Sequence, residues 1–514
     1  MPLYVVPQAY TGMHSSLGVD GETPGDFFEE ATHAKYLLEW SGLRFAKFFW
    51  RRNPLMTQTE DKTTSSTGDT PLVPMEKIVS LSKRRGFVFP NSEIYGGVSG
   101  IYDFGPLGVE MRNNIRRYWW WSMVQINDNV VGIEGNIITH PRVWEASGHV
   151  ENFVDQLVEC KNCKRRFRVD QLPAENLEQN KCPVCGGELG EPRLFNLMME
   201  TYIGVVEGER MKTYLRGEAC QNIYLDYENV LKSSRMQIPF GICQIGKAFR
   251  NEVTPGNFLF RQREFEQWDL QFFVHPSEME KWFDYWKERR FEWYKSIINH
   301  KDRLRLRPHD PDELAHYAKK AFDIEYRTVL GWQEWEGIHW RQDWDLSRHS
   351  LYSGHDLSYT DPETKERYIP WIVETSGGVD RTFLNLLLDA YEEEPPSGKD
   401  KEGRTVLRLH PWFAPVKVAV LPLQKNKEEL VTTAQDIHNR LKRLMVSQYD
   451  DVANIGRRYR RQDEIGTPFC VTVDFQTLED QTVTVRERDG MSQIRLQINE
   501  LPAYLLERVT WNYS

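Results

Sequence analysis

The sequence lacks an apolar run long enough to cross a bilayer, and its N-terminus lacks the basic segment and apolar core of a secretory signal. It also lacks internal repeats and a cysteine framework, since only 7 of its 514 residues are cysteine. An odd, scattered set of cysteines is typical of a reducing compartment. These absences favour a cytoplasmic protein with no membrane partner over a membrane-spanning, repeat or disulfide-stabilised secreted protein.

A strong positive charge is missing too. The formal net charge of −10 argues against a protein that coats nucleic acid nonspecifically, although it permits local basic patches. A chain of 514 residues is long enough for two or three domains with substantial cores, and its composition is ordinary for a globular protein. We therefore expect several folded domains, with any nucleic-acid contact confined to local patches.

Residues 1–74 differ from the rest of the chain. The segment Thr57–Thr70 is rich in Thr, Ser, Asp and Glu and is typical of a disordered linker, and Phe27–Phe49 predicts a short helix. No recognisable chemistry lies there, and we expect an atypical, disordered extension. One hypothesis places the true translation start at Met56 or Met75, and an intact mass of the native protein that includes the first residue would exclude it.

Regular patterning begins after this extension. The segment Met75–Arg85 predicts a helix that ends at Gly86. Further elements are expected at 109–127 (helix), 244–249 and 264–274 (strands), 277–299 (helix) and 392–404 (a linker containing Pro and Gly).

Strands and helices alternate after the linker, which predicts a small C-terminal α/β domain at 412–514. Its expected elements are strands at 416–421, 469–474 and 482–485 and helices at 427–444 and 492–508.

Four of the cysteines form two pairs. Cys160 and Cys163 are followed, after eighteen residues, by Cys182 and Cys185. This spacing is typical of a structural zinc site, because four thiolates close a tetrahedral shell and leave no open position for catalysis. The alternatives are two disulfides or two free pairs. We expect a zinc-binding lobe at about 155–195, inserted in a larger domain.

One segment, 245–267, combines arginines, acids and an aromatic ring around a Pro-Gly turn. Arg250 and Glu252 lie before the turn, and Arg261 and Phe265 lie after it, between two apolar runs that predict paired strands. Arginine offers bidentate donors to phosphate, and phenylalanine offers a stacking surface for a base. The alternative is a charged hairpin exposed to solvent.

The same hairpin closely resembles motif 2 of class II aminoacyl-tRNA synthetases, and among these the glycyl-tRNA synthetases. The resemblance extends over about Lys77–Trp511 and includes Ser99–Gly108, Ser147–His149 and Glu374–Arg381. It implies an α+β fold with an antiparallel class II catalytic sheet flanked by helices. It also implies an inserted zinc-knuckle lobe, a C-terminal α/β anticodon-binding domain and a homodimer.

The resemblance further implies glycine–tRNA ligase activity and three partners or cofactors for it: ATP with Mg²⁺, glycine and tRNA(Gly). The catalytic domain would span 75–405 and the anticodon-binding domain 412–514. Activation joins a carboxylate to the α-phosphate of ATP, so the site must neutralise the repulsion between two anions.

The resemblance also implies roles for particular side chains of the ATP site. Arg250 would contact the α-phosphate and the amino-acid carboxylate, and Arg381 would hold the γ-phosphate; both are the expected catalytic residues. Phe265 would stack on adenine, Glu252 would bond its amino group, and Glu334 would hold Mg²⁺ with ATP. The expected ATP-binding set is Arg250, Glu252, Phe260, Arg261, Phe265, Glu334 and Arg381.

Glycine offers only an ammonium and a carboxylate to recognise, so a selective site must bind both and fill the space of a side chain. By resemblance, Glu218, Asp269 and Glu374 would surround the ammonium, Ser376 would close the pocket and Arg341 would face the ligand. Each acid alone is more often a surface charge or a structural ion pair, but the joint match to separate positions of the family argues against that interpretation.

The sequence departs from the family pattern in this pocket and not in the ATP site. The family usually has Arg-Pro-Glu-Thr-Ala-Gln-Gly where 216–222 reads Arg-Gly-Glu-Ala-Cys-Gln-Asn, and Asp269, Thr375 and His339 replace a Glu, a Pro and a small residue. Two alternatives therefore stay open: a noncatalytic paralogue that binds tRNA or a nucleotide, and a ligase for another small amino acid such as alanine or serine. Glycine-dependent pyrophosphate exchange separates them.

Basic residues bunch in the C-terminal domain, with Tyr459 between them. Arginine with an interleaved aromatic ring can contact phosphates and stack on unpaired bases. A solvated helix face is the alternative, and the resemblance to an anticodon-binding domain favours RNA. The expected tRNA-binding residues are Arg457, Arg458, Arg460 and Arg461.

Overall fold

The computed structural model describes residues 71–169, 172–315, 317–396 and 403–511. The expected helix at 27–49 and linker at 57–70 lie outside the described residues. None of the described helices is both long enough and apolar enough to span a bilayer.

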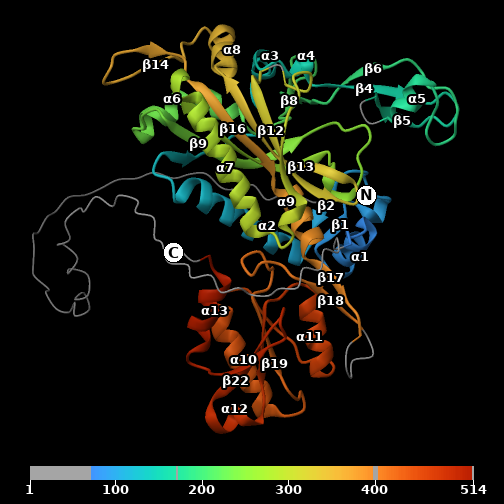
Figure 1. The fold of residues 1–514 in the computed structure, drawn as a ribbon, viewed down its shortest axis with the longest axis vertical. Helices are drawn as coiled ribbons and strands as arrows, with labels where there is room; N and C mark the ends of the chain where they lie inside the picture. The colour runs from blue at the N-terminus through green and yellow to red at the C-terminus, as the bar shows by residue number, and fades with distance from the viewer. Residues whose placement is uncertain (1–70, 170–171, 316, 397–402, 512–514) are drawn as a thin grey trace, which may run out of the picture. The chain divides into compact units, whose positions relative to one another are not determined.

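A seven-stranded sheet organises the larger, N-terminal part of the described chain (Figure 1). Its order is β11-β12-β13-β16-β10-β9-β3, and every neighbouring pair is antiparallel except β3 and β9. The predicted antiparallel sheet is therefore confirmed. Its strands are β3 Val130–Gly132, β9 Phe240–Phe249, β10 Glu264–Val274, β11 Leu304–Pro308, β12 Lys320–Thr328, β13 Gly331–Gln342 and β16 Trp371–Gly378.

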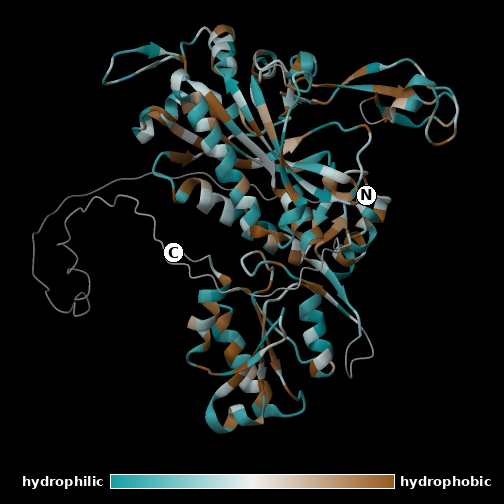
Figure 2. Ribbon diagram, in the orientation of Figure 1, coloured by the Kyte–Doolittle hydropathy of each residue, from teal (hydrophilic) through white to brown (hydrophobic). Residues whose placement is uncertain are grey.

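Both faces of this sheet are covered by helices. Successive residues of a strand point to opposite faces, and accordingly Phe272 packs in one hydrophobic core while Phe273 packs in another. Hydrophobic and hydrophilic residues are mixed along most of the helices, as Figure 2 shows, because a helix at the surface buries one side only. The first core includes α1 Met75–Arg85, α2 Pro106–Trp120, α7 Met279–Ile297 and α9 Val379–Ala390, and the second includes α6 Gln221–Ser234 and α8 Trp344–Ser353.

Several local predictions can be compared with these elements. The first helix is confirmed, and Gly86 ends it with φ 76°, a left-handed conformation that favours glycine. The second helix begins earlier than expected and continues into a π-helical turn, η2 Trp121–Gln125. The linker predicted at 392–404 is wrong at both ends, because β17 Tyr391–Glu394 pairs with β18 Arg404–Leu407.

Smaller elements surround the main sheet. The cysteine segment forms a three-stranded sheet with a short helix, and the described residues contain three strand pairs besides β17–β18. The short strands are β1 Val88–Pro90, β2 Tyr102–Phe104, β4 Val154–Glu159, β5 Arg166–Arg168, β6 Arg193–Asn196, β7 Met199–Ile203, β8 Met211–Leu215, β14 Tyr359–Thr360 and β15 Arg367–Tyr368. The short helices are η1 Glu93–Tyr95, α3 Arg142–Ala146, α4 His149–Asn152, α5 Ala174–Glu178, η4 Phe258–Phe260, η5 Pro276–Glu278 and η6 Lys301–Arg303.

The C-terminal domain has its own hydrophobic core around a five-stranded mixed sheet of order β20-β19-β21-β22-β23. The helix predicted at 492–508 is wrong in its first half, because the alternating segment Gln493–Gln497 forms strand β23 beside β22. The elements are β19 Val418–Pro422, β20 Ser447–Tyr449, β21 Phe469–Val473, β22 Thr482–Glu487, β23 Gln493–Gln497, α10 Glu428–Leu441, α11 Ile455–Glu464, α12 Phe475–Asp480 and α13 Leu501–Val509.

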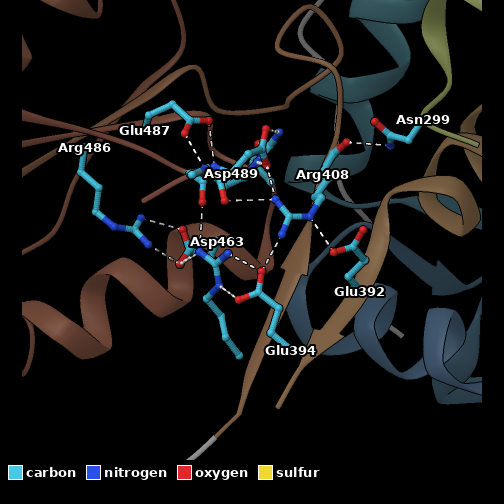
Figure 3. A network of polar contacts seen from close by, with 12 residues as sticks. Asn299, Glu392, Glu394, Arg408, Asp463, Arg486, Glu487 and Asp489 are labelled. Carbon is cyan, nitrogen blue, oxygen red and sulfur yellow. Dashed lines mark hydrogen bonds and ion pairs between the residues drawn. The ribbon is translucent and has the colours of Figure 1, made fainter. Parts of the chain in front are cut away.

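A network of ion pairs joins the hairpin β17–β18 to the C-terminal domain (Figure 3). Arg404 of the hairpin pairs with Glu394 at 2.6 Å and with the buried Asp463 of α11 at 3.1 Å. Arg408 pairs with Glu394 at 2.6 Å and with Asp489 at 3.2 Å. The described ends of the segment expected to be a linker are therefore paired with each other and joined by ion pairs to the C-terminal domain.

Candidate active site

A cavity of about 300 Å³ lies on one face of the seven-stranded sheet. Phe265 of β10 and Glu374 of β16 both line it. Alternation along each strand places these residues on the same face as Phe273 and Ile372, which pack under α6 and α8 at the opposite end of the strands. One sheet face therefore carries a hydrophobic core at one end and a polar cavity at the other.

The residues expected to bind ATP all line this cavity, although they come from separate elements. The glycine set divides: three of its members line the cavity, and Asp269 and Arg341 do not. The expected residues at the wall are Glu218, Arg250, Glu252, Phe260, Arg261, Phe265, Glu334, Glu374, Ser376 and Arg381.

Two of the arginines that line the cavity, Arg250 and Arg381, come from different elements. Arg250 follows the end of β9, and its guanidinium carbon lies 5.2 Å from the ring centroids of both Phe153 and Phe265. Arg381 lies in the first turn of α9, 4.8 Å from the ring centroid of Phe260, and donates to the carbonyl of Glu334 at 2.8 Å. Two such groups around one cavity suit a polyphosphate anion.

The hairpin that carries Arg250 is tied to an upstream glycine-rich segment. Arg263 donates from its side chain to the carbonyls of Ser99 at 2.6 Å and Glu252 at 3.0 Å. Its backbone N–H donates to the carbonyl of Gly100 at 2.8 Å. A side chain on Gly100 would collide with Pro255, whose Cβ lies 2.3 Å from the position of an added Cβ, so the close contact requires glycine there.

A β-bulge sets which side chains of β13 reach the cavity. The pairing of β12 with β13 shifts between Ile324 and Glu325. Strict alternation would send Glu334 and Gly337, three residues apart, to opposite faces, yet both line the cavity. Although desolvation opposes it, the charge of Arg381 lowers the pKa of Glu334 below its usual range, so this carboxylate is ionised.

Besides Glu334, two further ionised carboxylates line the cavity, each beside a histidine. Desolvation raises the pKa of Glu218, but His149, with Nε2 at 3.3 Å, contributes to a net pKa well below the usual range. Glu374 accepts from Arg341 at 2.8 Å and has His339 Nδ1 at 2.9 Å, and these groups outweigh desolvation and lower its pKa to about 2. Such a pair suits a bound ammonium.

Arg341 and Asp269 require a correction. Arg341 is buried behind Glu374 and is held by both carboxylate oxygens of Asp345, at 2.9 and 3.1 Å, so it orients Glu374 instead of facing a ligand. Asp269 is fully buried in the sheet, and burial followed by the charge of Glu374 raises its pKa well above the usual range. The wall of the cavity therefore carries two of the three expected acids.

Several residues at the wall were not predicted. Gln267 lies within the recognised hairpin and donates to Ser376 Oγ at 2.6 Å, so its position in that segment was an available signal. His339 could have been identified from the sequence, because it replaces a small residue of the family pattern. Tyr317 belongs to an irregular segment before β12 and carries no motif that would have identified it.

The four paired cysteines come together in the lobe. Their sulfur atoms all lie within 4.8 Å of one another, with 3.5 Å between Cys160 and Cys185 and 3.8 Å between Cys163 and Cys182. A tetrahedral ion bound by thiolates at about 2.3 Å separates its sulfur ligands by about 3.8 Å. The cluster therefore has the donor set and the spacing to hold a metal ion.

The basic segment of the C-terminal domain forms α11, and one of its members requires a correction. Arg458 is only 1% exposed and donates to the backbone carbonyls of Pro422, Leu423 and Asp450. It therefore stabilises the domain and offers no contact to RNA. Arg457 is exposed, and Arg461 pairs with Asp450.

Comparison with known proteins agrees with this geometry. The tRNA synthetase class II core domain (G, H, P, S and T) matches residues 205–391, and the anticodon binding domain matches 417–508. The fold and the cavity thus define a class II aminoacyl-tRNA synthetase.

Curated relatives specify the family. The chain is 55% identical to a glycine–tRNA ligase of Treponema denticola over 432 residues, which cover 84% of this chain and 96% of the relative. It is 52% identical to a glycine–tRNA ligase of Thermobifida fusca, and the match covers 85% of this chain and 98% of the relative. It is also 52% identical to a glycine–tRNA ligase of Borreliella afzelii, where the match covers 86% of this chain and 99% of the relative. The chain belongs to the glycine–tRNA ligase family.

Proposed function

We propose that this protein activates glycine with ATP and transfers it to the 3′ end of tRNA(Gly). The observation that carries the proposal is one cavity lined by Arg250 and Arg381 together with the ionised Glu218 and Glu374. Glycine is a zwitterion and ATP a polyanion, so their reaction requires sites of both charges side by side. The glycine carboxylate attacks the α-phosphate, and glycyl-adenylate and pyrophosphate form.

The arginines neutralise the phosphates in this scheme. Arg250 contacts the α-phosphate and the glycine carboxylate, and Arg381 holds the γ-phosphate. Phe265 stacks on adenine, while Glu252, Phe260 and Arg261 complete the nucleotide site.

An acid beside the phosphates suits Mg²⁺, which prefers carboxylate and phosphate oxygens. Glu334 is ionised and lies 3.4 Å from Arg381, so it would hold Mg²⁺ next to the triphosphate. When bound, Mg²⁺ would supply further neutralisation of the phosphate charge.

The carboxylates select the amino acid. Glu218 and Glu374 hold the ammonium, and Ser376 closes the pocket. Asp269 supports the site from within the sheet, and Arg341 keeps Glu374 in position and ionised. Because an extra methyl group is rejected only where it clashes, the volume of this pocket decides between glycine and larger amino acids.

The remaining parts have supporting roles in the proposal. The lobe at about 155–195 binds a structural zinc ion through its four cysteines, and the region 412–514 binds the anticodon through Arg457, Arg460 and Arg461. The catalytic domain spans 75–405, residues 1–74 are an extension, and the enzyme works as a cytoplasmic homodimer.

Pyrophosphate exchange and tRNA charging test the proposal. Purified protein should exchange pyrophosphate into ATP with glycine, and not with alanine or serine, and should charge tRNA(Gly). Exchange with alanine or serine in place of glycine would establish a different ligase. Binding of tRNA without any exchange would establish a noncatalytic paralogue, and either result would overturn the proposal.

A further inference from the structure

His339 occupies a distinctive place in the amino-acid end of the cavity. It lies on β13 directly opposite Glu374 of β16, and its Nδ1 is 2.9 Å from a carboxylate oxygen of Glu374. The other oxygen of Glu374 accepts from Arg341 at 2.8 Å. The carboxylate proposed to bind the substrate ammonium is thus held at both oxygens, and His339 is the one of these two partners that lines the cavity.

The neighbouring glycine shows how the imidazole lies. An added Cβ on Gly337 would be 2.6 Å from Cε1 of His339 and 3.3 Å from its Nε2. The ring therefore lies along the strand over Gly337, where any side chain would displace it. Gly337, His339 and Tyr317 all line the cavity, and the rings of Tyr317 and His339 meet edge to face at 6.0 Å.

We propose that His339 is a specificity-determining and positioning residue for the amino acid: its ring fills the space that a substrate side chain would need, and its Nδ1 holds Glu374 toward the ammonium. This inference rests on the proposed function, because it assigns the ammonium to Glu374. Arg341 and Gln271 hold the other oxygen of Glu374 without lining the cavity, so His339 is the partner of Glu374 that fills part of its wall.

Charge at His339 should also modulate glycine binding. The groups around it are Glu374 on β16, Asp323 on β12, His309 and Tyr317 before β12, and Arg341 and Glu334 on its own strand. Although desolvation opposes it, the bond to Glu374 raises the pKa of His339 above its usual value. Below that pKa the imidazolium offsets the charge of Glu374 and weakens its attraction for an ammonium.

The KM for glycine should depend on the protonation of His339. As the pH rises through the raised pKa, His339 becomes neutral while its Nδ1 stays beside Glu374, so the full carboxylate charge acts on glycine. The KM for glycine should therefore fall, by roughly tenfold, between about pH 6 and 9. The KM for ATP should not follow this change.

Two variants separate the role of volume from that of charge. His339→Ala removes the ring from the cavity wall and leaves space for a substrate methyl group. We expect the ratio of kcat/KM for glycine over alanine to fall by at least about tenfold, which is the discrimination that a pocket usually achieves against one extra carbon. His339→Gln keeps a donor of similar length without titrating, so it should keep selectivity and lose the pH dependence of the glycine KM that the wild type shows.

His309→Gln is the matched control. Its ring centroid is 6.2 Å from that of His339, and it pairs with Asp323 at 2.9 Å, but it does not line the cavity. It should keep both selectivity and pH dependence. Thermal unfolding of each variant shows whether it folds, and ATP binding measured by calorimetry shows whether the cavity is intact.

An unchanged glycine-to-alanine ratio in folded His339→Ala, or the wild-type pH profile in His339→Gln, would overturn the inference. Neither result touches the proposed function, which fails only if the wild type itself lacks glycine-dependent exchange. The two failures are therefore distinguishable in one assay series.

Discussion

Arg250 reaches the cavity because β9 ends at Phe249, immediately before it, and because two phenylalanine rings support its guanidinium. Its Nε donates to the carbonyl of Gly217 at 3.3 Å, which leaves its two amino groups for a ligand. An arginine fixed in this way binds an anion without first losing much conformational freedom.

Replacement of this side chain tests its role directly. In Arg250→Ala we expect kcat/KM for glycine-dependent pyrophosphate exchange to fall by at least about a hundredfold, the usual cost of losing one preorganised contact to developing charge. Arg440→Ala, an exposed arginine on α10, is the control and should exchange normally. Wild-type exchange in Arg250→Ala would refute the assignment.

Individual site residues could be predicted only where a local segment carried them. Arg250, Glu252 and Arg261 of the hairpin were found because their spacing is local, and all three line the cavity. Arg341 was misplaced because its direction depends on Asp345, four residues away on the start of α8, which holds its guanidinium inside the core. A sequence pattern contains the residue types but not this competition between partners.

At the scale of elements, α7 is fixed to the catalytic sheet by a buried ion pair. Arg290 donates to both oxygens of Glu336, at 2.5 and 2.9 Å, and Tyr294 and Trp268 also donate to this carboxylate. Both charged side chains are almost completely inaccessible to water. Their opposite charges satisfy each other where solvent cannot.

Removing one partner of this pair should be costly. We expect Arg290→Met to lower the free energy of unfolding by about 3–5 kcal/mol, because Glu336 would be left buried without its counter-charge. Chemical denaturation followed by tryptophan fluorescence measures the change. Arg289→Met, one position along on the partly exposed side of α7, should change stability by less than about 1 kcal/mol. Equal effects of the two variants would contradict this account.

The cysteine lobe is expected to depend on the zinc ion proposed to bind its four cysteines. Its hydrophobic core contains five buried residues, two of which are the cysteines Cys160 and Cys182, so little apolar burial remains to stabilise it. In Cys182→Ser, bound zinc should fall from one per chain toward zero, and hydrogen exchange of 154–196 should increase. Cys470→Ala, outside the lobe, should keep its zinc. Full protection of the lobe in a metal-free protein would contradict the prediction.

Elements were predicted well where hydrophobic periodicity and a terminating residue agreed, as in Met75–Arg85 with Gly86. The segment 492–508 was misassigned because five residues of alternating strand precede a true helix, and the boundary between them carries no glycine. The bulge in β13 could not be foreseen either, since it depends on pairing with β12.

At the scale of the whole described molecule, segments far apart in the sequence meet at α11. Asp463 pairs with Arg404 and Arg486, and the adjacent Glu464 pairs with Arg84 and Arg85 of α1. The helix proposed to contact tRNA is thereby fixed to the catalytic part through acids at its C-terminal end.

Weakening this connection should separate two activities. In Asp463→Asn we expect pyrophosphate exchange to stay within about twofold of wild type, while the KM for tRNA(Gly) in charging rises about tenfold, because two buried arginines lose their shared counter-charge. Asp436→Asn, an exposed acid on α10, should change neither value. A parallel loss of both activities in Asp463→Asn would indicate unfolding instead of uncoupled domains.

Because Arg263 contacts Ser99 and Gly100, the two segments that carry these residues should vary together among related proteins. These segments lie about 160 residues apart in the sequence, and Pro255 of the second can approach the first only because residue 100 is glycine. Chimeras that take 91–101 from one relative and 250–265 from another should lose this fit, whereas chimeras that exchange both segments as a unit should keep it.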